Sequence, residues 1–261
     1  MKTLVYHITY YDYDKSLYIQ FARCNFGCLG CIRKRYLWDH HIYKDSDVGG
    51  FEVQRFNTLS LEEFVEIIEK VYVEKGLKKA VLGGGEPTVD PTLCRIIDSL
   101  YSYGLEIVVL TNGFLMDRVI GCIPRNNLVI ELSIKSIHPE KFSIYTGRRC
   151  EDLQVVLRNL ELVYSNNIDL VIETILIPGF NDIDDVELIA KYIASRLGND
   201  IPLIIDEYVP IPSTPWRKPT LEELVEAKIR AEKYLRKVVI RSSYTMKPLG
   251  NVYQIYPKTI E

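Results

Sequence analysis

The chain is organised around Arg23-Cys24-Asn25-Phe26-Gly27-Cys28-Leu29-Gly30-Cys31, a segment with three cysteines in the spacing C-x3-C-x2-C. This spacing lets three thiolates of one turn-sized segment reach one small metal species. Iron–sulfur clusters that only carry electrons are usually held by four cysteine thiolates. Three thiolates would leave one iron with an open position. The spacing therefore predicts a chemically active [4Fe–4S] cluster with Cys24, Cys28 and Cys31 as its ligands.

Two other roles for these cysteines need to be weighed. Disulfide bonds are disfavoured because cysteines this close cannot all pair, and nothing else marks the chain as secreted. A structural zinc site needs four ligands, which usually come as two distant pairs, and this chain lacks a second pair. His40 or His41 could supply a fourth ligand. A zinc-stabilised binding module therefore stays as an alternative hypothesis.

A second motif, Gly83-Gly84-Gly85-Glu86-Pro87, follows a predicted strand at 79–82, just as the cysteine segment follows one at 17–21. With these two motifs the sequence resembles the radical S-adenosylmethionine (radical SAM) enzymes, from about Tyr18 to about Pro210. The resemblance implies that SAM binds the fourth iron through its amino and carboxylate groups. It implies also that an electron from the cluster splits SAM into methionine and a 5′-deoxyadenosyl radical, with flavodoxin or ferredoxin as the kind of low-potential donor.

Length and composition fit one α/β domain. The 261 residues are enough for a single barrel-type domain, which we expect to span 1–261 with a core at about 18–210 and a C-terminal helix and β extension at 211–261. A net charge of −3 and a pI near 5.9 argue against broad binding to nucleic acid, although a local basic patch could still exist.

Neither a membrane span nor a signal peptide is recognisable, so we expect a cytoplasmic protein. In a reducing compartment the six cysteines would be free thiols or metal ligands. Cys94, Cys122 and Cys150 stand alone in the sequence. We therefore expect them to be packing residues and not ligands of a second cluster.

Short apolar strands alternate with helical patterns along the chain, which predicts a partial (β/α)6 barrel of the TIM type with N- and C-terminal extensions. The expected strands are 4–13, 17–21, 79–82, 105–110, 128–134, 170–177 and 201–209. The expected helices are 60–76, 90–103, a short one near 116, 153–164, 186–196 and 221–236, and a β tail covers 238–256.

The strand ends of such a barrel carry the candidate SAM-binding residues, because active sites of α/β barrels lie at the carboxyl ends of the strands. A carboxylate at Glu86 repels a polyphosphate but attracts the α-ammonium of SAM. The resemblance implies that this motif contacts the methionyl amino group, and Gly84 and Gly85 allow close backbone approach. Thr111 and Asn112 follow the next strand in the same way.

The segment from Ser133 to Arg148 narrows the resemblance to the activating enzymes of glycyl-radical enzymes. Those enzymes carry Asp-Leu-Lys where this chain has Ser133-Ile134-Lys135. The resemblance implies that Lys135 contacts SAM, and Ser133 can still donate to or accept from a ribose hydroxyl. The segment that begins at Ile177 also resembles their motif, which makes Ile177 a further candidate SAM-binding residue. Glu173 replaces an arginine that pairs with SAM in some members.

One further departure from the family lies at Gly30, where most members have an aromatic residue that packs beside adenine. Phe26 or Tyr36 could replace it. The long connection from Cys31 to Asn57 is the leading candidate for substrate contact, because long structureless connections are often lids or binding loops. Its alternative role is a solvated loop that pads the barrel rim.

Three functional hypotheses follow. The first is a radical SAM enzyme that activates a glycyl-radical enzyme, based on Lys135 and the segments beginning at Tyr145 and Ile177. The second is radical SAM modification of a small molecule, peptide or RNA, in which Arg33 and Arg35 would pair with an anionic group. The third is the zinc-stabilised binding module.

Overall fold

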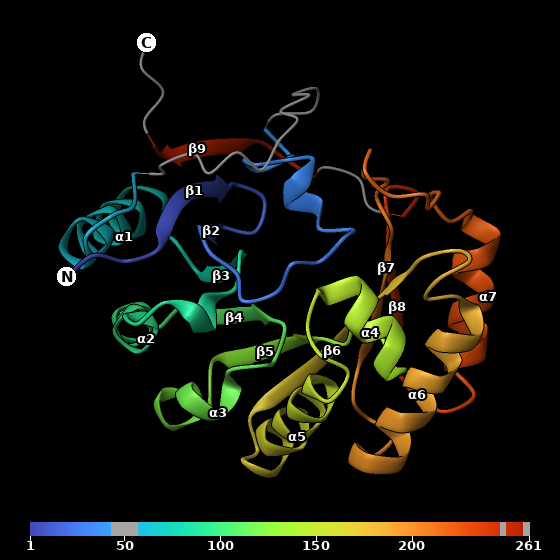
Figure 1. Cartoon of the computed structure of the whole chain (residues 1–261). Helices are drawn as coiled ribbons and strands as arrows, with labels where there is room; N and C mark the ends of the chain where they lie inside the picture. The colour runs from blue at the N-terminus through green and yellow to red at the C-terminus, as the bar shows by residue number, and fades with distance from the viewer. Residues whose placement is uncertain (43–56, 246–248, 258–261) are drawn as a thin grey trace.

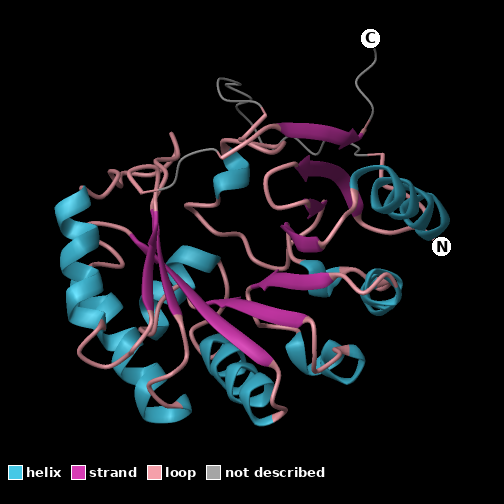
Figure 2. Cartoon of the chain, turned by 180° about the vertical axis from the view of Figure 1, so that it is seen from behind, coloured by secondary structure: helices cyan, strands magenta, loops and turns pink. Residues whose placement is uncertain are grey.

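The computed structural model describes residues 1–42, 57–245 and 249–257. Its framework is one nine-stranded sheet in the order β8-β7-β6-β5-β4-β3-β2-β1-β9. Strands β2 to β8 pair in parallel, whereas β1 is antiparallel to both β2 and β9. The sheet curves into an open barrel with helices on its convex side (Figures 1 and 2).

The strands and helices have the following bounds. The strands are β1 Val5–Tyr11, β2 Ser16–Phe21, β3 Lys79–Gly84, β4 Glu106–Thr111, β5 Leu128–Ser133, β6 Asp169–Leu176, β7 Leu203–Glu207, β8 Val238–Arg241 and β9 Val252–Tyr256. The α-helices are α1 Leu61–Lys75, α2 Leu93–Ser102, α3 Met116–Val119, α4 Pro139–Thr146, α5 Asp152–Ser165, α6 Ile183–Leu197 and α7 Leu221–Ala231. The 3-10 turns are η1 Ile32–Lys34, η2 Pro87–Val89 and η3 Ile120–Cys122.

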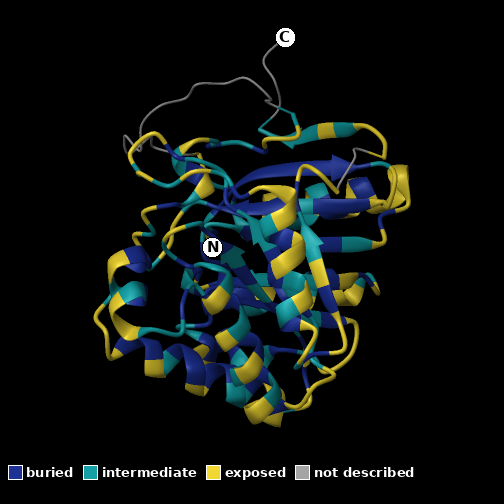
Figure 3. Cartoon of the chain, turned by 90° about the vertical axis from the view of Figure 1, so that its right-hand side faces the viewer, coloured by how far each residue is buried: buried dark blue, intermediate teal, exposed yellow. Residues whose placement is uncertain are grey.

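Side-chain alternation explains how the barrel is packed. Along β6 fully buried residues alternate with partly buried ones. Successive side chains of a strand point to opposite faces, so one set packs against the helices and the other faces the barrel interior. Figure 3 shows the same division, with buried strands at the centre and exposed residues on the outer faces of the helices. Glu173 and Ile175 belong to the inward-facing set, and both line a cavity there.

Local signals fix the ends of the long helices. Ser60 and Glu63 form a capping box at the start of α1, and Gly76 ends the helix in the left-handed conformation with φ 63°. Helices α6 and α7 begin with capping boxes too. These three helices agree with their predicted positions to within a few residues, except that α7 ends at Ala231, earlier than expected.

The predicted partial barrel is confirmed, but its two edges differ from the expectation. The β tail at 238–256 is two strands on opposite edges of the sheet. Strand β8 adds a parallel strand beside β7, and β9 pairs with β1. Helix α4 was not predicted from the sequence either. Pairing between the two ends of a chain leaves no signal in local periodicity, which explains the first difference.

None of the helices in the described part of the chain has the length and apolar content needed to cross a bilayer. The expectation that the three isolated cysteines are packing residues is wrong. Cys94 and Cys122 form a disulfide bond between α2 and η3, whereas Cys150 is free and exposed. The Cα atoms of the two disulfide-bonded cysteines lie 5.5 Å apart. Residues 28 apart in the sequence give no local hint of this pairing.

We expect the disulfide to stabilise the fold measurably. The loop it closes limits the unfolded chain, and the loop-entropy relation gives about 3.5 kcal/mol for this length. The double variant Cys94→Ser/Cys122→Ser should therefore melt roughly 5–10 °C lower than the parent in thermal unfolding followed by circular dichroism. Cys150→Ser is the matched control and should melt with the parent. Equal melting temperatures for all three proteins would contradict the prediction.

Candidate active site

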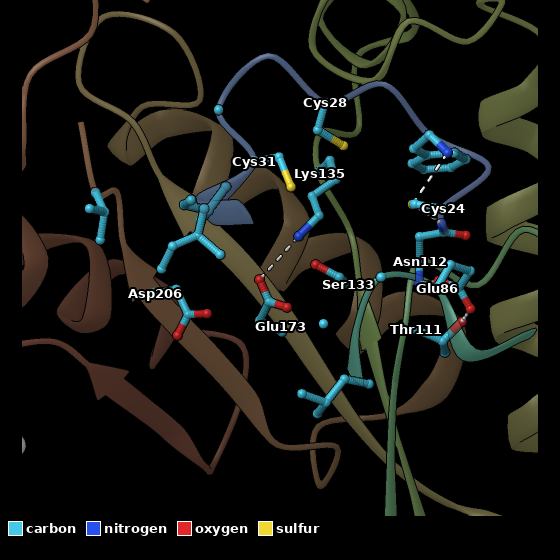
Figure 4. A pocket seen from close by; sticks show the side chains of 18 of the residues that line it. Cys24, Cys28, Cys31, Glu86, Thr111, Asn112, Ser133, Lys135, Glu173 and Asp206 are labelled. Carbon is cyan, nitrogen blue, oxygen red and sulfur yellow. Dashed lines mark hydrogen bonds and ion pairs between the residues drawn. The ribbon is translucent and has the colours of Figure 1, made fainter. Parts of the chain in front are cut away.

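The three cysteines of the C-x3-C-x2-C segment lie on the wall of one cavity of about 290 Å³ at the carboxyl ends of the strands (Figure 4). Two backbone hydrogen bonds hold their loop. The amide of Gly27 donates to the carbonyl oxygen of Thr146 at 2.8 Å, and that of Leu29 donates to Tyr145 at 2.8 Å. The end of α4 therefore supports the loop between its first and last cysteines.

The thiols fit a bound metal cluster. Cys24 is exposed at the cavity mouth, yet burial of its thiol raises the pKa to about 11, and burial raises the pKa of Cys28 to about 12. Without a cation these thiols stay protonated at neutral pH, whereas a coordinated metal ion deprotonates a thiol outright. Among the described residues, three cysteines and no fourth line this cavity, which fits the predicted open [4Fe–4S] site.

Gly30 makes room for two tyrosines. A Cβ atom at this position would lie 2.7 Å from the ring of Tyr208 and 2.9 Å from the hydroxyl oxygen of Tyr145. The two expected substitutes for the family's aromatic residue lie outside this space, although Phe26 lines the same cavity. Phe26 packs edge-on against Phe114 and Phe142, and Tyr36 contacts His40. The sequence analysis missed Tyr208, because it lies beyond β7 and far from the cysteines in the sequence.

The glycine motif after β3 is hydrogen-bonded to the start of the cysteine loop. The amide of Gly85 donates to the carbonyl of Phe21 at 2.9 Å, and that of Glu86 donates to Arg23 at 2.7 Å. A Cβ atom on Gly85 would lie only 2.2 Å from the Arg23 carbonyl oxygen. Gly84 has φ 82°, the left-handed region that favours glycine. Both residues line the cavity, as expected for a site of close approach.

The carboxylate of Glu86 joins the ends of β3 and β4. Its Oε1 accepts from the backbone amide and hydroxyl of Thr88 and from the hydroxyl of Thr111 at 2.7 Å. Its Oε2 accepts from the amide of Asn112 at 2.7 Å. Burial raises the pKa of Glu86. The side-chain amide of Asn112 in turn donates to Asn25 at 2.7 Å inside the cysteine loop.

Ser133 and Lys135 line the same cavity as Glu86. Lys135 Nζ lies 3.4 Å from Glu173 Oε1. Although burial opposes it, this carboxylate raises the pKa of Lys135, so the ammonium stays charged. Burial likewise opposes ionisation of Glu173, but Lys135 and Arg241 lower the pKa of its carboxyl group. The pair places one cation close enough to the Cys28 thiol to act on its pKa.

The structure brings together nearly all of the predicted site residues. The cavity wall includes the three cysteines, Gly84, Gly85, Glu86, Thr111, Asn112, Ser133 and Lys135. Ile177 is the exception. It is fully buried behind the wall in an apolar cluster with Tyr145, Tyr208 and Ile211, because β6 ends one residue earlier, at Leu176.

Several residues that line the cavity were not predicted. They come from the ends of β7 and β8, and they include Asp206, Glu207 and Arg241. The charged residues at the ends of β7 and β8 could have indicated this part of the cavity. They were overlooked because β8 was not predicted to belong to the barrel. Glu173, noted only as a departure from the family, lies in the same group.

The predicted role of Arg33 is wrong. Its side chain is buried, donates to the carbonyl of Ala22 at 3.1 Å and lies over the ring of Tyr6, so it supports the strand end. Arg35 donates to the carbonyl of Pro210 at 3.0 Å and is exposed. Residues 43–56, which make up most of the long connection predicted to contact substrate, lie outside the described residues.

Comparison with known proteins gives one family and partial relatives. The family model described as the Radical SAM superfamily matches residues 18–193. A protein named GTP 3′,8-cyclase from Synechocystis sp. is 28% identical over 64% of this chain and 46% of its own length. One from Brucella canis is 30% identical over 70% of this chain and 49% of its own. The chain thus spans about half the length of the curated relatives it matches.

Solved structures agree on the fold. Streptococcus suis SuiB bound to S-adenosylmethionine superposes with a TM-score of 0.63 at 13% identity, over 85% of this chain and 48% of SuiB. A domain of pyruvate-formate lyase-activating enzyme from Bacteroides vulgatus gives a TM-score of 0.51 at 23% identity, over 63% of this chain and 99% of that domain.

Proposed function

The chain belongs to the radical SAM superfamily, and from that premise we propose that it cleaves SAM reductively and abstracts a hydrogen atom from an organic substrate held in the same cavity. The observation that carries this proposal is the convergence of three thiols, the clamped Glu86 and Lys135 on one cavity wall. Radical SAM enzymes use a [4Fe–4S] cluster and SAM, and the donor set here fits both. This family membership replaces the zinc-module hypothesis.

When bound, the cluster supplies the electron for SAM cleavage, and the protein does the rest by binding and orientation. Lys135 attracts the carboxylate of SAM, because its ammonium group lies near the Cys28 thiol and, among the residues that the structure describes, pairs with Glu173 alone. Glu86 Oε2 accepts one protein hydrogen bond and keeps a lone pair for the α-ammonium of SAM. Ser133 is in position to hydrogen-bond the ribose. A low-potential electron donor is the partner that this chemistry needs.

Small-molecule modification is the form of this chemistry that we favour over activation of a glycyl-radical enzyme. The curated relatives carry the name of a cyclase that acts on a nucleotide. The segments that suggested an activating enzyme have roles inside the cofactor site. Tyr145 and Thr146 hold the cysteine loop through their carbonyl groups, and Ile177 packs behind the wall. These residues therefore do not point to a protein substrate.

We expect protein reconstituted anaerobically with iron and sulfide to release 5′-deoxyadenosine from SAM when a strong reductant is added. The variant Lys135→Met should keep its iron but bind SAM roughly 10- to 100-fold more weakly, because a hydrogen bond to a charged group contributes about 1.5–3 kcal/mol. Chromatography of the nucleoside product and equilibrium binding of SAM measure the two effects.

Lys79→Met is the matched control, because Lys79 pairs with Glu106 at the opposite end of β3. It should bind SAM like the parent. A protein with a full complement of iron that releases no 5′-deoxyadenosine would overturn the proposed function. Unaltered SAM affinity in Lys135→Met would remove only the assigned role of the lysine.

A further inference from the structure

We propose that the substrate carries an ammonium group, and that this group binds at the carboxylate wall of the cavity, which we define as Glu173, Asp206 and Glu207. The inference rests on the proposed function and names the substrate class for the same cavity. None of these three residues belongs to the glycine or cysteine motifs. All three line the part of the cavity formed by β6 and β7, together with Arg241 of β8.

The register of the strands brings the wall together. Glu173 lies on β6, Asp206 and Glu207 end β7, and Asp206 is the direct partner of Arg241 on β8. Figure 4 shows the side chains of Glu173 and Asp206 directed into the space below the cysteines. The wall therefore faces the place where a substrate must lie to reach SAM.

The cations around the wall are already engaged. Arg241 donates from Nε to Asp206 Oδ1 at 2.6 Å and from Nη2 to Asp206 Oδ2 at 2.8 Å, and Nη2 lies 2.8 Å from Glu131. Lys135 pairs with Glu173, and Lys218 lies 3.3 Å from Glu207 while it donates to Ser243. These three cations face four carboxylates. An anionic substrate would thus meet a net negative surface whose cations have partners, whereas an ammonium group would meet attraction.

One buried oxygen atom of the wall has an ion-pair partner but no hydrogen bond. Within the described residues, Glu207 Oε2 makes no hydrogen bond. Lys218 Nζ lies 3.3 Å from this oxygen without the alignment of a hydrogen bond. Buried polar groups in folded proteins nearly always have partners. Glu207 is an acceptor only, so a well-aligned donor, such as an ammonium group of the substrate, would complete its hydrogen bonding.

The charge of Asp206 agrees with this geometry. Burial and the nearby Glu173 carboxylate raise the pKa of Asp206 to about 7, despite its contact with Arg241. A second positive charge at the wall would lower this pKa and favour the ionised carboxylate. An ammonium group would then be held by charge-assisted hydrogen bonds, which are roughly twice as strong as neutral ones.

The competing explanation is that the wall serves SAM, whose sulfonium and ammonium groups outnumber its single carboxylate. Three probe molecules with the same number of carbon atoms but different charges distinguish substrate binding at the wall from SAM binding there. We would titrate the reconstituted, SAM-saturated holoenzyme by anaerobic calorimetry with 1,5-diaminopentane, 1,5-pentanediol and glutarate. We expect the diamine to bind at least tenfold more tightly than the diol, and glutarate to bind more weakly than the diol. Tighter binding of GTP or glutarate than of the diamine would overturn the proposal.

The variant Asp206→Asn/Glu207→Gln should bind the diamine 10- to 100-fold more weakly than the parent does. The loss of diamine affinity should be at least tenfold larger than the loss of SAM affinity. The matched control is Glu69→Gln/Asp98→Asn, which makes the same charge change at exposed positions of α1 and α2 and should bind the diamine like the parent. Equal losses for SAM and the diamine would assign the wall to SAM instead.

Glu207→Gln alone covers the case in which the double variant does not fold, because Glu207 does not bind Arg241. Iron content and melting temperature identify such a case. These outcomes are independent of the proposed function, since the probes can fail to discriminate in a protein that cleaves SAM normally. If the diamine binds no more tightly than the diol to the parent protein, the inference is wrong while the SAM chemistry stands.

Discussion

Replacement of any one of Cys24, Cys28 and Cys31 by Ser is expected to leave the protein without a stable cluster and without 5′-deoxyadenosine production. The three thiols are the only cysteines that the described residues place on the cavity wall. A hydroxyl is a poor substitute for a thiolate toward iron, and two remaining thiolates cannot hold a cluster that normally has three or four. Iron should fall from about four per chain to below one.

Iron and sulfide analysis after anaerobic reconstitution measures this loss, together with the brown absorbance of the cluster. Cys150→Ser is the matched control, because Cys150 is an exposed free thiol outside the cavity. It should retain iron and activity. A cysteine variant of the loop that keeps four irons and cleaves SAM would show that the cluster has another ligand, and the assignment of the loop would be wrong.

A single methyl group at Gly85 should have an effect of similar size on the cofactor site. The Cβ atom of Gly85→Ala would overlap the carbonyl oxygens of Arg23 at 2.2 Å and Phe21 at 2.5 Å. Both are backbone atoms at the base of the cysteine loop, so the overlap can be relieved only by moving the loop or the end of β3. Overpacking of this kind costs about 1–3 kcal/mol, and here the strain falls on the metal site.

Gly85→Ala should therefore reconstitute with much less iron and bind SAM at least tenfold more weakly, and its melting temperature should fall by several degrees. Gly121→Ala is a sharp control, because no atom lies within 4 Å of the Cβ it would add. The same methyl group there should leave iron content and SAM affinity unchanged. If the two alanine variants take up iron equally, close packing between the glycine motif and the loop is not needed for the site.

Sequence reasoning found the parts of the site whose signals are local. The cysteine spacing and the strand–glycine–carboxylate motif each lie within a few residues, and the structure brings them to one cavity wall. Ser133 and Lys135, which the family resemblance identified as candidate SAM contacts, also line this cavity.

The rest depends on contacts between distant parts of the chain. Arg241 reaches the cavity only because β8 pairs with β7, and the sequence analysis placed that segment in a tail. Gly30 was interpreted as a missing aromatic residue, whereas Tyr208 fills its space from beyond the seventh strand. The disulfide between Cys94 and Cys122 likewise joins residues that are distant in the sequence. None of these pairings has a periodic or positional signal in a single sequence.

Because α4 supports the cysteine loop, the order of chain synthesis limits when the cluster can be inserted. Gly27 and Leu29 donate to Thr146 and Tyr145, which are synthesised more than one hundred residues later. While the chain emerges from the ribosome, the three thiols are therefore present long before the backbone that positions them. Iron delivered at that stage would meet a loop without its native shape. Cluster insertion should accordingly follow the folding of the first half of the barrel. Its timing depends on when these two main-chain hydrogen bonds form.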